Sequence, residues 1–386
     1  MELPSLKLLV FLLIILWSSR TVLPQHVVET LPGLPDKLPN KLETGYVGVG
    51  EDEKVQLFYY FFESESNPEE DPFILWLTGG PGCSGLSTIL MEIGTFVIDY
   101  PNCKGGQTAL KLNEYAWTKS ASILFIDQPV GTGYSYSNTL EGYITNDTLS
   151  TRICYDFLRK WLIKHPQYLK NPLYILGESY SGITLPLIVN EVYKGLQAGD
   201  KPTLNMKGYA LGNPVTDIYQ DNNERIPLTI AGAGFQSAKA NCHGNYINGD
   251  SMNILCVNDL RKIKQCLDKI YLPQILEPWC EEALWTPKRH DIMSLYASSV
   301  EEMTIDFIQP VVARKEKEWC REDNVFLTYL WANDKAVQKA LNVPEYAQGD
   351  YELTYATIKG SGHTNAEFKP KESFAMLDRW IRGSDL

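Results

Sequence analysis

Several features are scarce or missing in this 386-residue sequence. Beyond residues 8–17, no stretch is apolar for the roughly 20 residues that a membrane helix needs. Lys and Arg form no continuous basic stripe and the formal charge is −12, so nucleic acid is not an expected partner. The eight cysteines contain no Cys-x-x-Cys pair, which disfavours a zinc site, and we expect neither a metal nor a cofactor.

The chain begins with a pattern typical of a secretory signal. Lys7 precedes the apolar residues 8–17, and two serines follow them. We therefore expect residues 1–25 to be a signal peptide and the mature product to be secreted or vacuolar, without a membrane anchor. That oxidising route favours disulfides. It also suits the single Asn-x-Ser/Thr sequon, which predicts glycosylation at Asn146.

The hydrophobic pattern predicts an α/β fold. Short apolar runs of strand length alternate with a helical pattern at residues 149–162, as in a mostly parallel sheet with right-handed crossovers. An alternating pattern at 46–49 and 54–62 predicts a pair of strands ahead of it. The predicted strands of the parallel part are residues 72–77, 121–127, 173–178 and 206–211.

The second half of the chain changes in character. Strand periodicity fades at residues 214–324, where five cysteines lie, and we interpret this stretch as an inserted cap. The α/β core then comprises residues 26–213 and 325–386. Its last part should hold a helix at 331–341, a strand at 353–358 and a final helix that Pro370 opens.

A nucleophile elbow is predicted where the strand at 173–178 ends. The sequence Gly-Glu-Ser-Tyr-Ser-Gly, residues 177–182, joins a strand to a helix through a sharp turn that presents Ser179. The usual pattern is Gly-x-Ser-x-Gly, but here Ser181 takes the fifth place and the glycine is displaced to Gly182. An ordinary turn between strand and helix is the alternative for this motif alone.

Two further stretches supply the remaining parts of a serine hydrolase. The run Thr-Gly-Gly-Pro-Gly-Cys at 78–83 follows a predicted buried strand and exposes backbone N–H groups, which suits an oxyanion site. His363 follows a late predicted strand on a glycine-flanked turn, where this fold needs its general base.

These motifs together resemble one family. Residues 76–83, 127–136, 177–180 and 362–363 are similar to the serine carboxypeptidase family, and more closely to its plant serine carboxypeptidase-like branch, from about residue 31 to the C-terminus. The resemblance implies an α/β-hydrolase fold with a disulfide-stapled cap. It also implies cleavage of C-terminal residues from peptides through a Ser-His acyl-enzyme mechanism.

The resemblance assigns roles residue by residue. Ser179 is the nucleophile, His363 the base, and the backbone N–H groups of Gly80 and Tyr180 form the oxyanion hole. The places that bind the substrate carboxylate in the family are Thr78, Gly79, Glu92 and Glu178 here. Two acidic side chains can bind a carboxylate only when they share a proton, so such a peptidase should favour acidic pH.

Thr78 departs from the carboxypeptidase pattern, in which an asparagine stands at that place. Family members that have become acyltransferases share the threonine. They move an acyl group from a glucose ester to an alcohol through the same acyl-enzyme chemistry. An acyltransferase that takes glucose esters of phenolic acids is therefore the alternative prediction.

The acid of the triad presents a larger departure. The family places an Asp after a strand, then a helix, the last strand and the histidine. Here only about nine residues separate the helix ending at residue 341 from the strand that leads to His363, too few for a crossover. We predict that a block between Val343 and Tyr351 is missing. Asp350 is a poor replacement, and a catalytically impaired variant is a further alternative.

The family resemblance also implies a disulfide pattern. It pairs Cys83 with Cys320, Cys242 with Cys256 and Cys266 with Cys280, and it leaves Cys103 and Cys154 unpaired.

Overall fold

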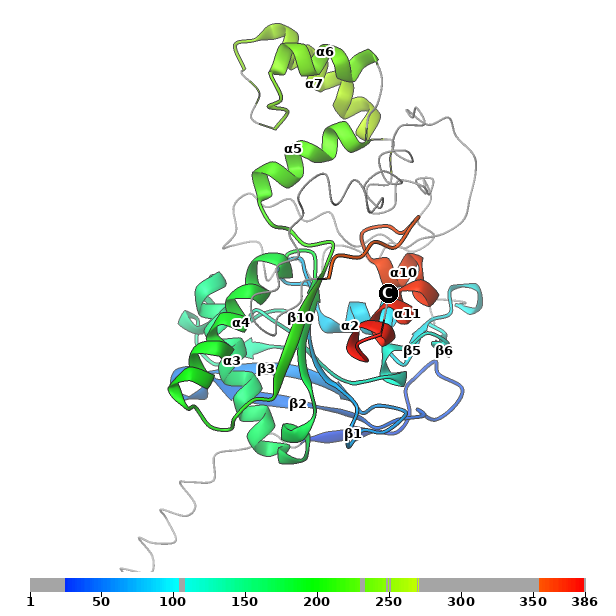
Figure 1. The fold of residues 1–386 in the computed structure, drawn as a ribbon, viewed down its shortest axis with the longest axis vertical. Helices are drawn as coiled ribbons and strands as arrows, with labels where there is room; N and C mark the ends of the chain where they lie inside the picture. Colours follow the sequence, from blue (N-terminus) through cyan, green and yellow to red (C-terminus); the bar gives the residue numbers. More distant parts are fainter. Residues whose placement is uncertain are drawn as a thin grey trace, which may run out of the picture. The chain divides into compact units, whose positions relative to one another are not determined.

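A mixed sheet of eight strands forms the core of the protein (Figure 1). The computed structural model describes residues 25–103, 108–229, 233–247, 249, 251–268, 270 and 354–384. The strand order is β1-β2-β3-β7-β4-β9-β10, and β8 pairs with β3. The strands are β1 (His26–Val28), β2 (Leu42–Val49), β3 (Val55–Phe62), β4 (Phe73–Leu77), β7 (Ser122–Ile126), β8 (Tyr136–Ser137), β9 (Leu173–Glu178) and β10 (Met206–Gly212).

The sheet is parallel in one part and antiparallel in the other. β7, β4, β9 and β10 run parallel to one another, whereas β1, β2 and β3 pair antiparallel and β3 pairs antiparallel with β7. This arrangement confirms the predicted α/β-hydrolase fold class. It also confirms the four parallel strands and the antiparallel pair that precedes them.

β4 lies inside the parallel part, and its five residues are all buried. Its side chains alternate between two cores. Phe73, Leu75 and Leu77 join the core that α3 (Asp147–Lys164) and α4 (Ser181–Ala198) cover. Ile74 and Trp76 join the core on the other face, which residues from η2 (Ile89–Ile93) and α11 (Pro370–Ile381) help to form. A strand buried on both faces explains why its sequence is apolar throughout.

Helices cover both faces of this sheet (Figure 1). The longest are α3 and α4, which pack on each other. Shorter elements complete the unit: a second sheet pairs β5 with β6, and several single turns connect the strands. The helical bounds are α2 (Gly85–Thr88), α3 (Asp147–Lys164), α4 (Ser181–Ala198), α10 (Asn365–Phe368) and α11 (Pro370–Ile381); the π-helical turn is η2 (Ile89–Ile93); the second sheet is β5 (Phe96–Ile98) and β6 (Leu110–Leu112); the 3-10 turns are η1 (Glu51–Glu53), η3 (Tyr100–Asn102), η4 (Trp117–Lys119), η5 (Glu141–Tyr143) and η6 (Pro166–Lys170).

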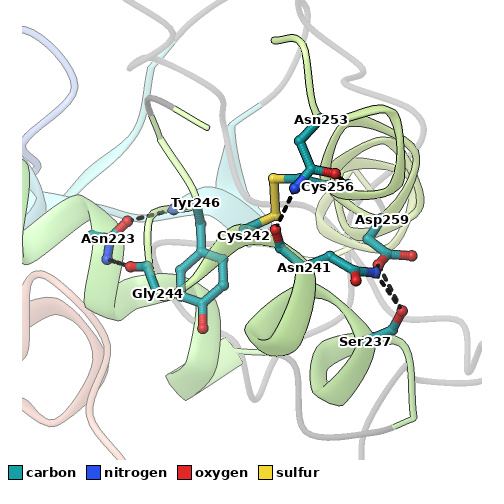
Figure 2. The surroundings of a disulfide bond; sticks show 9 residues. All are labelled: Asn223, Ser237, Asn241, Cys242, Gly244, Tyr246, Asn253, Cys256 and Asp259. Atoms are coloured by element: carbon teal, nitrogen blue, oxygen red, sulfur yellow. Dashed lines mark hydrogen bonds between the residues drawn. A yellow bond between two sulfur atoms is a disulfide. The ribbon is translucent and has the colours of Figure 1, made fainter. Parts of the chain in front are cut away.

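The chain divides into two compact units, one of residues 1–216 and 364–386 and the other of residues 217–363. The described part of the second unit holds α5 (Ile218–Thr229), α6 (Ala233–Cys242) and α7 (Ile254–Leu267). The Cys242–Cys256 disulfide ties α6 to α7 (Figure 2), and it joins the pair implied by the family resemblance. α7 begins at a polar cap, where the Asn253 side-chain oxygen accepts a hydrogen bond from the Cys256 N–H at 3.1 Å.

One predicted strand is wrong. Residues 354–358 are described and are not in a strand. Within the described residues no strand pairs with this segment, and hydrophobic pattern alone cannot make a strand without a neighbour. The predicted helix at 331–341 lies outside the described residues. The predicted final helix is confirmed as α11, with Leu377 and Ile381 buried.

Candidate active site

Ser179 stands on a strained turn between β9 and α4. Its φ is 57°, which places a non-glycine residue in the left-handed region. Backbone hydrogen bonds fix this conformation. The Ser179 N–H donates to the Gly212 carbonyl at 3.0 Å, and the Ser179 carbonyl accepts from the N–H groups of Gly182 and Val215 at 3.0 and 2.8 Å. A serine held in this way is the geometry of a nucleophile elbow.

The displaced glycine of the motif has a steric reason. A Cβ on Gly182 would lie 2.2 Å from the Val215 carbonyl oxygen, so no larger residue fits there. Ser181, at the place usually held by glycine, is buried, and its hydroxyl donates to the Leu77 carbonyl at 2.9 Å. Ser181 therefore ties the elbow to the end of β4 and is not presented as a second nucleophile.

The glycine-rich loop after β4 lies against the elbow. A Cβ on Gly79 would be 2.6 Å from the Ser179 Cβ and 3.1 Å from the Tyr180 backbone nitrogen. Only glycine allows this approach. Gly80 follows with a φ of 115°, again a conformation suited to glycine. The two segments predicted to supply the oxyanion donors are thus neighbours, and the role of Gly80 and Tyr180 as donors stays a prediction.

Two buried carboxyl groups, those of Glu178 and Glu92, belong to the candidate site. Glu178 ends β9 and Glu92 belongs to η2, and their exposed fractions are 8% and 5%. Burial raises the pKa of Glu178 to about 7. Burial and then the charge of Glu178 raise the pKa of Glu92 well above its ordinary value, and Glu92 donates a hydrogen bond to Glu178. The pair shares a proton, because two like charges this close cannot both ionise.

Two residues that the sequence analysis missed extend this pair. Thr88, fully buried and four residues before Glu92, hydrogen-bonds to Glu92 and lies 3.1 Å from the Thr78 hydroxyl oxygen. Glu367, on α10, adds a negative charge that raises the pKa of both members of the pair. Thr88 could have been found from the sequence, because residues four apart, such as Thr88 and Glu92, face each other on a helix. The position of Glu367 four residues after His363 was a weaker one.

The predicted base, His363, belongs to the second unit, whereas Ser179 belongs to the first. Burial and then the positive charge of Arg225 hold the pKa of His363 below its ordinary value. Both causes favour the neutral imidazole, which is the form that can accept a proton from a nucleophile. Its pairing with Ser179 stays a prediction.

Family comparison places these features in context. The family model described as serine carboxypeptidase matches residues 32–352 and 345–383. The chain belongs to the serine carboxypeptidase family. It is 37% identical to serine carboxypeptidase-like 1 of Arabidopsis thaliana over 436 residues, covering 98% of each chain. It is also 37% identical to serine carboxypeptidase-like 10 of that plant over 446 residues, covering 99% of each.

Solved structures resemble the chain more distantly. KEX1(DELTA)P, a prohormone-processing carboxypeptidase of Saccharomyces cerevisiae, matches with a TM-score of 0.49 and 25% identity over 64% of this chain and 57% of that one.

The match to serine carboxypeptidases breaks near residue 350. Its two segments end and begin within residues 345–352. The alignment to serine carboxypeptidase-like 1 is 436 positions long, although 98% of this 386-residue chain is about 378 residues, so about 58 positions of the alignment have no residue of this chain. The break falls in the stretch where the sequence analysis placed the missing block. Asp350 itself lies outside the described residues.

The other predicted sites divide between described and undescribed residues. Asn146 is exposed and caps α3, its side-chain oxygen accepting from the Leu149 N–H at 2.9 Å. Cys103 and Cys154 form no disulfide in the part of the chain that the structure describes. The predicted partners of Cys83 and Cys266, which are Cys320 and Cys280, lie outside it, as does the predicted signal except Gln25.

Within the described ranges, no group of three or more His, Cys, Asp or Glu side chains could hold a metal ion. No helix in those ranges is both long enough and apolar enough to span a bilayer.

Proposed function

We propose that this chain is a secreted or vacuolar serine carboxypeptidase-like enzyme that forms an acyl-enzyme at Ser179. The Ser179 oxygen bonds to the acyl carbon of the substrate while its proton passes to His363, which then protonates the leaving group. The observation that carries the proposal is the positive φ of Ser179 with the Gly79 backbone pressed against it. Neither feature has a purpose in an ordinary turn between a strand and a helix.

The buried acid pair supports a peptide C-terminus as the substrate. A substrate carboxylate is an acceptor, so it needs a proton donor that remains protonated at the working pH. Protonated Glu178 meets this need below about pH 7, because burial raises the pKa of its side chain to about 7. We therefore expect carboxypeptidase activity to decline as the pH rises through neutrality.

Thr78 favours a second candidate, an acyltransferase that uses glucose esters of phenolic acids. Its hydroxyl oxygen lies 3.1 Å from the Thr88 hydroxyl oxygen, so part of its hydrogen-bonding capacity is directed toward Thr88. An asparagine at this place would offer an amide N–H to a substrate carboxylate. In the transfer reaction the acyl group leaves the sugar for Ser179 and then passes to an alcohol instead of water.

The missing block favours a third candidate, an impaired enzyme without the triad acid. Such an acid orients the histidine and stabilises it when protonated, and loss of this role costs about 10⁴ in kcat in a well-studied serine protease. The break in the family match supports this candidate.

Labelling with a serine-directed fluorophosphonate tests the proposal. We expect the parent and Ser181→Ala to react covalently and Ser179→Ala to remain unlabelled. Labelling of Ser179→Ala at the parent rate would remove Ser179 from the mechanism. Protein that reacts with the fluorophosphonate is then assayed with blocked dipeptides and with a phenolic glucose ester. Turnover of the first substrate indicates a peptidase, and turnover of the second indicates a transferase. Labelling without turnover of either substrate would identify the impaired enzyme.

A further inference from the structure

One fully buried carboxyl group lies outside the proposed triad and the acid pair. Asp127 follows β7, and its two oxygens accept four hydrogen bonds. Oδ1 accepts from the Ser84 hydroxyl at 2.6 Å and the Gly85 N–H at 2.9 Å. Oδ2 accepts from the Tyr134 N–H at 3.0 Å and the Tyr60 hydroxyl at 3.4 Å. A carboxylate fits this set of donors because it has acceptor sites alone.

Two of these donors belong to the start of α2. Ser84 is the N-cap of that helix, and it directly follows the glycine-rich loop at residues 79–83. Three of the five loop residues are glycines, and one backbone hydrogen bond, from the Cys83 N–H to the Gly79 carbonyl at 3.2 Å, closes the loop. Asp127 therefore holds the C-terminal end of the loop, while β4 holds the N-terminal end.

The surroundings of Asp127 leave it no freedom to move. A Cβ on Gly133 would be 2.1 Å from Oδ2, so the turn at residues 131–135 closes directly over the carboxyl group. The Ser135 hydroxyl donates to the Asp127 carbonyl and its oxygen accepts from the Phe58 N–H at 2.8 Å. Contacts with β3, β7 and the turn at residues 131–135 therefore fix the carboxyl group independently of its contacts with α2.

We propose that Asp127 is a positioning residue that holds the glycine-rich loop at residues 79–83 against the nucleophile elbow. By fixing Ser84 and Gly85 it keeps residues 79–83 in the conformation that brings Gly79 onto Ser179. The catalytic consequence rests on the function proposed above, whereas the ordering of the loop does not.

Asp127→Asn tests this proposal, because the amide keeps the shape of the side chain but turns one acceptor into a donor that faces other donors. Two measurements follow: hydrogen exchange of the amides in residues 79–86, and the rate of fluorophosphonate labelling. We expect exchange there to rise at least ~10-fold, and labelling to slow by about 10², the loss typical of one oxyanion donor.

The matched control is Asp71→Asn. Asp71 lies two residues before β4, at the opposite end of that strand from the loop, and accepts from the Ser64 hydroxyl at 2.6 Å and the Asn67 N–H at 2.8 Å. We expect this variant to leave both readouts at the parent values. Equal effects from the two variants would show a general loss of packing and overturn the proposal.

The experiment also covers a variant that does not fold and a parent that is not labelled. If Asp127→Asn does not fold, Ser84→Ala removes one of the four bonds and should give a smaller change in the same direction in both readouts. If the parent itself is not labelled, the function proposed above fails. Hydrogen exchange then decides the positioning role alone, and unchanged exchange of residues 79–86 in a folded variant would refute it.

Discussion

The buried acid pair makes the stability of the protein depend on pH in a direction that can be worked out. Glu178 has an ordinary pKa of 4.5 and, through burial, one of about 7 in the folded protein. Between these values the folded chain keeps a proton that the unfolded chain releases. Stability is therefore full below pH 4.5 and is lost as the pH rises through 7.

The size of the effect follows from the shift in pKa. Each pKa unit corresponds to 1.36 kcal/mol, so Glu178 should contribute a loss of about 3 kcal/mol between pH 4.5 and 7. That is a large part of the free energy of unfolding of an ordinary domain. The double variant Glu92→Gln/Glu178→Gln has no proton to share, and we expect its stability to change far less over this range.

Urea denaturation at several pH values, followed by tryptophan fluorescence, measures the difference. The control is Glu114→Gln/Glu141→Gln, which removes the same two charges from exposed positions and should keep the parent's pH dependence. The reasoning is refuted if the parent and the Glu92→Gln/Glu178→Gln variant lose equal stability between pH 4.5 and 7. Both carboxyl groups would then ionise in the folded protein as they do in the unfolded one.

Three further predictions concern other parts of the chain. Insertion of a family-like segment ending in Asp between residues 343 and 351 should raise turnover by about 10⁴, and equal turnover without it would mean that another carboxylate serves as the acid. The secreted parent protein should lose mass on glycosidase treatment. The Thr148→Ala variant, which keeps the Asn146 cap but lacks the sequon, should not lose mass. An unchanged mass of the parent would exclude a glycan at Asn146. The pKa of Glu43 is lowered to about 2, since hydrogen bonds led by that from His165 outweigh its burial. The stability that Glu43 provides is therefore present above pH 4.5 and lost toward pH 2. In the Glu43→Gln variant the free energy of unfolding should fall less between pH 4.5 and 2 than in the parent. An equal fall in the two proteins would contradict this.

The sequence predicted those parts of the fold in which local pattern and tertiary position agree. β4 is apolar throughout, and β7 is apolar after Ser122, because both faces of these strands are buried. A turn that contains glycines follows each strand, at residues 79–82 and 131–133. The elbow was recognisable for the same reason. A strand that ends at Glu178, followed at once by a helix that begins at Ser181, leaves few conformations for Ser179.

Contacts between distant segments were beyond that reasoning. The role of Asp127 depends on Ser84, which is 43 residues away, and that of Glu367 depends on Glu92 from a different part of the chain. The predicted strand at 353–358 failed in a similar way. Its pattern was suitable, but a strand forms only beside a neighbour, and the family match breaks at residues 345–352, just before this segment.

The parts of the candidate site nevertheless differ in how much they need that block. Ser179, the glycine-rich loop at residues 79–83 and the acid pair depend on β4, β7 and β9, which are hydrogen-bonded neighbours in one sheet. The triad acid, in contrast, would come from the missing block. A chain without the block can therefore keep a well-formed elbow and lose most of its turnover. Covalent labelling of Ser179 together with very slow hydrolysis is the combination that follows from this arrangement.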